Sequence, residues 1–448
     1  MVVYIETDIC MLTRHTKGKI GAIAIGVMCL FPIAGWLLAA PVAERFESTF
    51  MMLTSVGQLT GLVGVVLFAL TLILSARLSF LEDYFGGLDR LYNVHHITGT
   101  IAFICLSFHP LMLAARELSF STYDAALFLL PSSNWPKNFG IISFLLLMAL
   151  LCVTFYATWR YHLRKFLHQF LGLAFFIGAL HGFLMPGTLS STLWLMWPVL
   201  FLCSLGVFAF LYRTLFGKVL VHRYRYTVSA VNRLDDTITE IVMWPKQESM
   251  HYESGQFIFI SFKHGGIKSE THPFSISSAS HEKVLRVTVK ALGDYTTSLK
   301  DLRVGAEARI EGPFGAFSYI HGFNLNQIWV AGGIGITPFL SMARHLFANT
   351  HTGHHVDFYY STRTKQEMIF LPELEKIAAA YPQFRVIPFN ADEKGFISMD
   401  AIQNHSTEIM GKDIYVCGPP PMMHSIVGQC RTKGIPSRFV HCEEFKLL

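Results

Sequence analysis

Charged residues are scarce in this sequence, and they are scarcest in its first half. Asp, Glu, Lys and Arg make up 15% of the 448 residues, against 52% hydrophobic residues. Residues 1–218 hold 22 of these charged side chains and residues 219–448 hold 45. Such a composition excludes a disordered chain and a protein that coats nucleic acid. We expect the first half to lie in a membrane and the second half in water.

The sequence also lacks a CxxC pair, although it has eight cysteines, four of them inside apolar runs. A zinc knuckle, a ferredoxin-type cluster and a disulfide framework are therefore not indicated, and the thiols are interpreted as small buried side chains. Internal repeats are lacking as well. The net charge of +5 is small, and the basic residues of the first half lie in short clusters between apolar runs. This pattern is typical of membrane topology rather than of phosphate binding.

Six apolar runs are each long enough to cross the hydrocarbon core, which takes about 20 helical residues. Lys and Arg gather before the first run, between the second and third, between the fourth and fifth, and after the sixth. By the positive-inside tendency these segments face the cytoplasm, as do both termini and the whole second half. The runs are 20–40, 52–75, 93–114, 139–158, 166–185 and 192–214.

From about residue 222 the pattern changes to short β-branched and aromatic stretches, which predicts a small antiparallel barrel. From about residue 327 strand-like runs alternate with helical segments, as in a parallel sheet covered by helices. We expect a six-span transmembrane domain (1–218), an antiparallel β-barrel (219–320) and a Rossmann-like α/β domain (321–448). The expected strands are 224–231, 237–243, 256–262, 284–291 and 307–311 in the barrel, then 327–331, 356–361, 384–387, 413–417 and 438–441.

Five histidines lie inside the third and fifth apolar runs, where ionisable side chains are costly and point to function. Four of them form two pairs at matching depths. His95 and His109 are 14 residues apart, and His168 and His181 are 13 apart. At ~1.5 Å per residue both spacings cover about 20 Å, so His95 matches His168 near the inner face and His109 matches His181 near the outer one. Two imidazoles per iron leave no open position. The pattern therefore indicates two b-type haems that carry electrons across the bilayer.

The helical phase of these histidines is less regular than their depth. On an ideal helix His109 lies within about 40° of His95, but His181 lies about 140° from His168. The fifth span therefore needs local overwinding, or ligands that reach the two haems from different sides.

His96 is the alternative to His95 as the inner ligand. We prefer His95 because Gly99 follows it by four residues, as Gly172 follows His168. A glycine one turn away lets a flat macrocycle approach the helix.

Haems take up single electrons whereas a nicotinamide delivers a hydride, so a flavin is required between them. The run VAGGIGITPF (330–339) joins an apolar strand to Gly332, Gly333 and Gly335, where the backbone must approach a pyrophosphate. Thr337 is the expected N-cap of the next helix, with Pro338 at its first position.

Two further segments fit the same sheet. Ser361 and Arg363 follow the next strand, where a ribose 2′-phosphate would sit, and a solvated Arg363 is the alternative interpretation. A second turn, YVCGPPPMM (415–423), puts Cys417 and Gly418 at the carboxyl end of the sheet, where doubly wound folds bind ligands.

These residues together resemble the ferric reductase and NADPH oxidase superfamily, in which a six-span haem domain is fused to a ferredoxin-reductase-like dehydrogenase. The likeness covers nearly the whole chain and includes FLEDYFGGLDRLYNVHHITG (80–99) and the Leu-Gly of residues 171–172. In that family the first histidine of each pair binds the inner haem and the second binds the outer haem, which agrees with the depths given above.

The resemblance also implies the cofactor sites of the second half. HPFSISS (272–278) and VKALGDYTTSL (289–299) are similar to the family's two FAD segments, and the 332–338 turn with CGPPPM (417–422) is similar to its nicotinamide site. Ser361 and Arg363 then favour NADPH. The implied FAD residues are His272, Pro273, Phe274, Ser275, Ser277, Lys290, Gly293, Tyr295 and Thr296, and Cys417, Gly418 and Pro419 join the nucleotide turn.

The end of the chain resembles the family's acidic-aromatic ending, whose ring covers the flavin until nicotinamide displaces it. Glu444 and Phe445 are the matching residues, but three residues follow Phe445 here. Cys417 and Phe445 are the candidate catalytic residues.

The sequence thus predicts a compact prokaryotic flavocytochrome of the plasma membrane. NADPH is oxidised at a cytoplasmic FAD, and single electrons pass through both haems to an outer acceptor. Oxygen, giving superoxide, is preferred because the outer connection 115–138 is expected to cap the outer haem and admit only a small molecule. A ferric chelate, a haem protein or a quinone are alternative acceptors. Arg116 and Arg45 are candidates either for attracting an anion or for anchoring at the interface.

Two other classes of function remain open. One is a haem-free membrane transport protein with a proton path and a nucleotide-sensing domain. The other is a flavin reductase that is merely tethered to the bilayer. No nucleic-acid partner is expected, and the sequence specifies no oligomeric state.

Overall fold

The computed structural model describes residues 2–157, 161–263, 265–406 and 408–443. It divides into two compact units, one formed mainly by Thr16–Gly86 with Arg90–Val221 and the other mainly by His222–Leu448. We call them the helical unit and the sheet unit.

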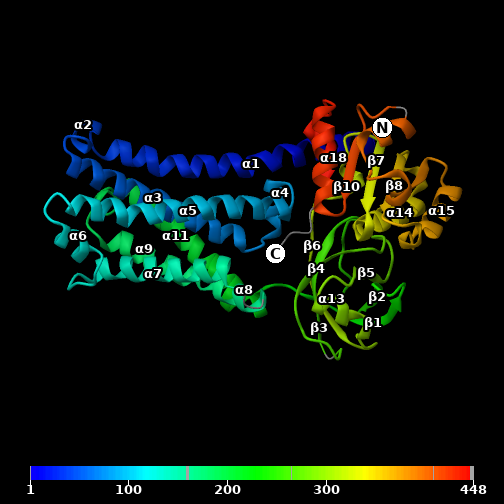
Figure 1. Cartoon of the computed structure of the whole chain (residues 1–448), viewed down its shortest axis with the longest axis horizontal. Helices are drawn as coiled ribbons and strands as arrows, with labels where there is room; N and C mark the ends of the chain where they lie inside the picture. The colour runs from blue at the N-terminus through cyan, green and yellow to red at the C-terminus, as the bar shows by residue number, and fades with distance from the viewer. Residues whose placement is uncertain (1, 158–160, 264, 407, 444–448) are drawn as a thin grey trace. The chain divides into compact units, whose positions relative to one another are not determined.

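The helical unit consists of long apolar helices (Figure 1). Within the described part of the chain, six helical stretches are long and apolar enough to cross a membrane, which confirms the six predicted runs. They are Ile20–Ala39, Thr49–Ser75, Arg90–Glu117, Trp135–Tyr156, Leu163–Leu184 and Leu193–Leu215. Its helices are α1 (Val2–Ala39), α2 (Val42–Arg45), α3 (Thr49–Ser75), α4 (Ser79–Phe85), α5 (Leu88–Glu117), α6 (Thr122–Phe128), α7 (Trp135–Tyr156), α8 (Tyr161–Gln169), α9 (Leu171–Leu184), α10 (Thr188–Ser191), α11 (Leu193–Phe210), η1 (Leu211–Leu215) and α12 (Gly217–Leu220).

Small residues let these helices pack closely. A Cβ added at Gly64 of α3 would lie 2.7 Å from Leu106 of α5, and one at Gly206 of α11 would lie 3.1 Å from the backbone of Ala69. Lipid tails are as apolar as leucine, so close backbone approach is a main source of helix association in a bilayer. Helix α3 therefore contacts α5, α9 and α11 and forms the centre of the unit.

The fifth span is interrupted between its two histidines. Helix α8 ends at Gln169 and α9 begins at Leu171. The N–H of Phe170 donates to Leu167 O (3.0 Å), and the N–H of Leu173 donates to Phe170 O (2.9 Å). Bonds between residues three apart tighten a helical turn. The structure thus has a local overwinding between the two histidines, which is one of the two alternatives expected from the 13-residue spacing.

The sheet unit begins with a six-stranded antiparallel sheet in the order β4-β3-β6-β1-β2-β5. A bridge between Ile276 and Val287 joins the two edges, so the sheet is a nearly closed barrel, as predicted. The strands are β1 (Tyr224–Arg233), β2 (Ile238–Pro245), β3 (Phe257–Lys263), β4 (His272–Ser275), β5 (Leu285–Lys290) and β6 (Glu307–Phe314), with α13 (Asp294–Ser298), η2 (Leu299–Asp301) and η3 (Tyr319–His321) in the connections.

A five-stranded parallel sheet follows, in the order β11-β10-β7-β8-β9, which confirms the predicted α/β domain. Side chains of β7 alternate between the two faces: Trp329 joins the core with α14 and α15, and Ile328 joins the core with α17 and α18. The elements are β7 (Asn326–Gly332), η4 (Gly333–Ile336), α14 (Thr337–Ala348), η5 (Thr350–Thr352), β8 (His355–Thr362), η6 (Lys365–Glu367), α15 (Leu371–Ala380), β9 (Phe384–Asn390), α16 (Ala391–Lys394), α17 (Met399–His405), β10 (Asp413–Cys417), α18 (Pro420–Thr432), η7 (Ser437–Phe439) and β11 (Val440–Cys442).

Candidate functional site

The outer pair of membrane histidines is held in one orientation. The Nδ1 of His109 on α5 lies 2.7 Å from Gly57 O, and the Nδ1 of His181 on α9 lies 2.7 Å from Pro136 O. A carbonyl can only accept, so each Nδ1 carries the proton and each Nε2 keeps its lone pair. This is the tautomer in which a histidine binds a metal through Nε2.

The spacing of these two rings fits one metal ion between them. Their centroids are 6.1 Å apart and their planes are inclined by 66°. On a straight line, two metal–nitrogen bonds of about 2 Å and roughly 1.2 Å from each nitrogen to its ring centre add up to about 6.4 Å, close to this spacing. The geometry therefore fits a bis-histidine iron.

Two glycines make room for the rings. A Cβ added at Gly61 would lie 2.6 Å from His109 Nδ1, and one at Gly140 would lie 2.9 Å from the His181 ring. Each glycine is four residues beyond the accepting carbonyl, at Gly57 and Pro136, so one turn of a neighbouring helix supplies both the acceptor and the space. The sequence analysis missed both glycines. The only signal was the Gly57-to-Gly61 spacing, which is typical of close helix contacts.

A cavity of about 470 Å³ opens at the outer pair. Its lining is mainly apolar and includes Phe128 at the end of α6 and Leu129. Besides the two histidines, the polar side chains in the lining include Thr54, Gln58, Arg116, Lys137, Ser143 and Thr188. Of the two arginines singled out from the sequence, Arg116 therefore lines the cavity. Arg45 is buried instead, with its guanidinium 4.0 Å from the Trp36 ring centroid and hydrogen-bonded to Trp36 O.

The inner histidines are held less uniformly. The Nδ1 of His95 lies 2.9 Å from Thr71 O, whereas that of His168 lies 3.4 Å from the Thr154 hydroxyl. His96 is exposed and meets the His95 ring edge-on. The backbone acceptor favours His95 over His96 as the ligand.

The interpretation of Gly172 as an opening for a macrocycle is wrong. A Cβ there would lie 2.2 Å from the Phe210 ring, so this glycine makes room for an aromatic side chain of α11. At Gly99 the nearest atom to such a Cβ is the Thr71 methyl, at an ordinary 3.4 Å.

In the sheet unit, the two FAD segments meet through an aromatic stack. His272 on β4 stacks on Tyr295 of α13, with centroids 4.1 Å apart and planes inclined by 16°. The hydroxyls of Ser275 and Tyr295 are buried and have no hydrogen-bond partner among the described residues. Unsatisfied buried polar atoms call for an explanation such as a ligand. Burial also raises the pKa of Tyr295, so its hydroxyl stays protonated and able to donate.

Other residues of these segments differ in role. Pro273 and Phe274 are half-buried on β4, and Lys290 is half-buried at the end of β5. Ser277 is fully buried and accepts from the Thr288 hydroxyl (3.0 Å), so its side chain supports the strand end.

The turn after β5 is stabilised by hydrogen bonds within the turn. The Thr296 hydroxyl accepts from the backbone N–H groups of Leu292 and Gly293. No atom lies within 4 Å of a Cβ added at Gly293, so the space above this turn is open. The exposed turn therefore has room for a ligand phosphate.

The glycines of the 332–338 turn have two different functions. A Cβ at Gly335 would lie 2.5 Å from Cys417 O, and one at Gly332 would lie 2.6 Å from Met422 Sδ, so both allow the two strand-to-helix turns to touch. Gly333 alone faces open space and has φ +52°. Protein packing therefore explains Gly332 and Gly335, and only Gly333 has open space beside it. That a pyrophosphate approaches the backbone of this turn stays a prediction.

The start of α14 also differs from the prediction. Thr337 is the first helical residue, with φ −55° and ψ −45°, and its hydroxyl donates to Ile334 O (3.1 Å). Pro338 is the second residue of the helix. A preceding 3-10 turn, η4, takes the place of a side-chain cap, so the predicted N-cap at Thr337 is wrong.

The second turn places a thiol at the carboxyl end of the sheet. Cys417 is fully buried, and burial, followed by the charge of Glu443, raises the pKa of its thiol. Gly418 packs against Gly332, and Pro419 precedes α18. The sequence analysis missed the buried Glu443, which is one residue away from the expected Glu444. Glu444 and Phe445 lie outside the described residues.

The residues expected at the ribose phosphate lie where β8 ends. Ser361 is buried and pairs in register with Gly332 of β7. The side chain of Arg363 is 81% exposed and lies 3.7 Å from an Asp392 carboxylate oxygen. Its charge is therefore available beside the nucleotide turn.

Three segments of the chain match known families. Residues 60–179 match the ferric reductase like transmembrane component, residues 223–318 match an FAD-binding domain, and residues 329–428 match the oxidoreductase NAD-binding domain. Each match lies within one of the three predicted regions.

Curated relatives are similar over about half of the chain. The reductase component of propane 2-monooxygenase from Mycolicibacterium goodii is 24% identical over 258 residues, which are 54% of this chain and 73% of that protein. The glycine betaine monooxygenase reductase subunit of Chromohalobacter salexigens is 27% identical over 232 residues, 49% and 62% of the two lengths. A flavohemoprotein of Xylella fastidiosa is 24% identical over 237 residues, 50% and 59%. The last two are thus matched over less than two thirds of their length.

Solved structures show weaker likeness. The flavohaemoglobin of Malassezia yamatoensis has a TM-score of 0.49 and 16% identity, covering 88% of this chain and 96% of that one. The FAD/NAD-binding domain of nitric oxide dioxygenase from Vibrio cholerae has a TM-score of 0.43 and 21% identity, covering 49% and 97%.

Proposed function

The chain is an oxidoreductase with the architecture of ferric reductase and NADPH oxidase-like flavocytochromes, and we propose that it carries electrons from NADPH through FAD and two b-type haems across a membrane. Oxygen, reduced to superoxide, is the proposed outer acceptor. We also propose domain limits at 218/219 and 320/321, both termini in the cytoplasm, and the plasma membrane of a prokaryote as the location.

One observation carries this proposal: the outer imidazoles are spaced for a shared iron, and backbone carbonyls hold both Nδ1 protons. A proton path needs histidines that exchange protons with water or with each other, whereas these Nδ1 atoms are fixed. The arrangement therefore supports haem ligation over haem-free transport.

When bound, FAD would accept a hydride from NADPH and the haems would pass its electrons on one at a time. The residues of the chain bind and orient these groups. The stacked rings of His272 and Tyr295 would form a flat surface for the flavin. The empty space beside Gly333 would leave room for the nucleotide phosphates. On the outer side, His109 and His181 would hold the second haem.

The lining of the outer cavity supports a small acceptor. Phe128 and Leu129 line it, and the Arg116 guanidinium lies 5.8 Å from the Phe128 ring centroid. The mainly apolar lining suits a small neutral acceptor such as oxygen better than a bulky charged ferric chelate. Lys137 would attract the superoxide anion formed there, whereas the charge of Arg116 is paired with Glu117.

The test uses the full chain, purified in detergent and supplied with FAD. We expect a Soret band, NADPH consumption in air, and dye reduction that superoxide dismutase suppresses. His109→Ala should lose the outer haem and the superoxide signal but keep flavin reduction, and the exposed neighbour variant His96→Ala should keep both. Protein without a Soret band would refute the haem proposal, and activity only with a ferric chelate under argon would refute the choice of oxygen.

The preference for NADPH has its own test. Arg363→Ala removes the exposed charge beside Ser361, so the Michaelis constant for NADPH should rise about tenfold, the usual scale for one charged hydrogen bond. The constant for NADH serves as the internal control and should stay unchanged. An equal rise for both nucleotides would exclude a role for Arg363 at the 2′-phosphate.

A further inference from the structure

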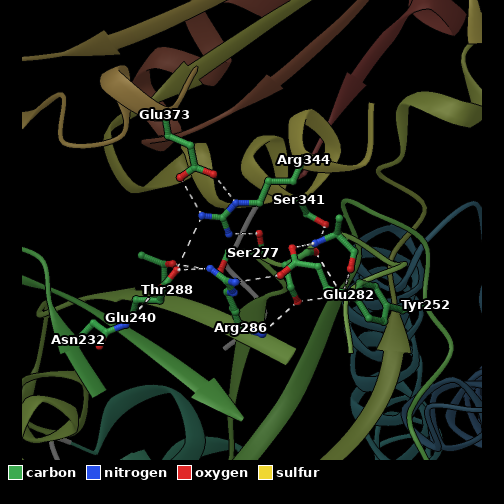
Figure 2. Close-up of polar contacts among 12 residues, drawn as sticks. Asn232, Glu240, Tyr252, Ser277, Glu282, Arg286, Thr288, Ser341, Arg344 and Glu373 are labelled. Carbon is green, nitrogen blue, oxygen red and sulfur yellow. Dashed lines mark hydrogen bonds and ion pairs between the residues drawn. The ribbon is translucent and has the colours of Figure 1, made fainter. Parts of the chain in front are cut away.

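An ion-pair network lies between the barrel and the parallel sheet of the sheet unit (Figure 2). At its centre is Arg344 on α14, whose side chain is only 12% exposed. Its guanidinium makes two bonds to the Glu373 carboxylate on α15, at 2.6 and 2.9 Å, and lies 3.8 Å from Glu240 on β2. Burial lowers the pKa of Arg344, but the hydrogen bonds and charge of Glu373, with Glu240 adding, raise it overall. Arg344 is therefore a buried cation shared by both domains.

Arg344 also bonds to the backbone of the flavin segment. It donates to Ser277 O (2.7 Å), and one turn earlier on the same helix Ser341 donates to Ser278 O (2.5 Å). These carbonyls come directly after β4, which ends at Ser275. Two adjacent carbonyls on the flavin side are thus held by two side chains of one helix.

The helix that makes these bonds, α14, begins in the glycine-rich turn 332–338, which we call the nucleotide turn. Helix α14 starts at Thr337, directly after Gly333–Ile336, and reaches Arg344 after two turns. A helix this short is rigid, so its contacts with Ser277 and Ser278 fix the distance between the nucleotide turn and β4.

On the barrel side, Ser278 is also held in place by hydrogen bonds. The Ser278 hydroxyl accepts from the Arg286 N–H (3.0 Å) and bonds to the Tyr252 hydroxyl (2.8 Å), and the Arg286 guanidinium lies 3.1 Å from Glu282. The carbonyls that Arg344 and Ser341 bind therefore belong to a fixed segment rather than a free loop.

We propose that Arg344 is a positioning residue for hydride transfer, because its hydrogen bonds to Glu373 and Ser277 fix the distance and orientation between the nicotinamide and the flavin. This inference rests on the proposed function. In the transfer, the C4–H bond of the nicotinamide breaks, an N5–H bond forms on the flavin, and the electron pair moves with the hydride to give NADP⁺ and reduced FAD. The rate of such a step is sensitive to misplacement of about 1 Å.

The experiment is stopped-flow reduction of FAD by NADPH under argon, with the full chain. Arg344→Met should lower the limiting rate of reduction by about 10- to 100-fold and leave the dissociation constant of NADPH nearly unchanged. It should also weaken the long-wavelength charge-transfer band and raise the deuterium isotope effect with C4-deuterated NADPH. Arg344→Lys keeps the charge but not the two-pronged geometry, so it should fall between wild type and Arg344→Met. Ser341→Ala should show a smaller change of the same kind.

Arg233→Ala is the matched control. Arg233 forms an exposed 3.0 Å ion pair with Asp301, and both residues belong to the barrel. This variant should reduce FAD at the wild-type rate. If Arg344→Met does not retain FAD, the limiting rates and isotope effects of Arg344→Lys and Ser341→Ala test the proposal. Wild-type limiting rates and isotope effects in both would overturn the proposal. If neither NADPH nor NADH reduces the flavin of the wild-type protein, the proposed function itself would be overturned.

Discussion

Glycines create space in both units, but what fills the space differs. In the helical unit Gly61 and Gly140 make room for the rings of His109 and His181, which are side chains. In the sheet unit Gly335 makes room for the backbone of Cys417 and Gly418. A ring can turn away from an added methyl group, whereas the backbone of a buried strand cannot. The same substitution should therefore move a ligand in one unit and disrupt the fold in the other.

The largest effect is expected for Gly335→Ala. The new Cβ would lie 2.5 Å from Cys417 O and 2.6 Å from Gly418 Cα, so the two nucleotide turns must separate. Overpacking of this kind costs about 1–3 kcal/mol, and it should also abolish NADPH binding. Thermal unfolding and an NADPH titration measure both effects. Gly428→Ala on α18 is the control, because no atom lies within 4 Å of its added Cβ. Its unfolding temperature and NADPH binding should equal those of wild type. Wild-type NADPH binding by Gly335→Ala would contradict the fixed backbone contact.

A smaller, more local effect is expected for Gly61→Ala. The methyl group would meet His109 Nδ1 at 2.6 Å and push the ring off Gly57 O, while the helices stay packed. Loss of such an outer partner lowers metal affinity by about 10- to 100-fold. Haem content and the Soret band should fall by about half, with flavin reduction unchanged. Gly182→Ala, next to His181 but in open space, provides the comparison and should keep all its haem. Equal haem loss in both variants would remove the distinction drawn here.

The smallest effect is a pH-dependent one in the sheet unit. Asp357 is buried on β8, and its carboxylate accepts from the Ser406 hydroxyl and from Arg385, both at 2.7 Å. Burial raises its pKa, but these bonds and the charge of Lys412 lower it overall. Because the folded pKa is lower than the unfolded one, the stabilisation is complete above about pH 4 and is lost as the pH falls below it.

Asp357→Asn should therefore reduce the free energy of unfolding by about 1–3 kcal/mol at neutral pH. The difference from wild type should shrink as the pH falls from neutral to below about pH 4. Denaturant unfolding of both proteins across this range is the measurement. A difference that stays constant with pH would show that the carboxylate charge is not involved.

Features that depend on neighbouring residues could be predicted from the sequence. The six membrane spans, the barrel strands and the parallel sheet follow from local runs of hydropathy and alternation, and the structure has each of them. The depths of His95 and His168, and of His109 and His181, depend only on the rise of a helix. Even the overwound turn at Phe170 could be expected, because 13 residues do not match the helical period.

Errors arose where a residue's function depends on a distant part of the chain. Gly172 was assigned to a macrocycle, yet Phe210 of another helix fills its space. Gly332 and Gly335 were interpreted only through a pyrophosphate, yet they also pack against a turn more than 80 residues away. A glycine in a sequence shows that space is needed but not what occupies it.

The sequence alone therefore determined the division into a half of long apolar helices and a half of short strands and helices, since composition and periodicity are local properties. The candidate FAD residues came instead from the resemblance to a known family. Only the tertiary structure decided which atoms face one another. It placed Gly57 O and Pro136 O at the histidine rings, and it placed Arg344 between the flavin segment and α15. Such contacts join residues far apart in the chain, and they form only when the helices and sheets pack.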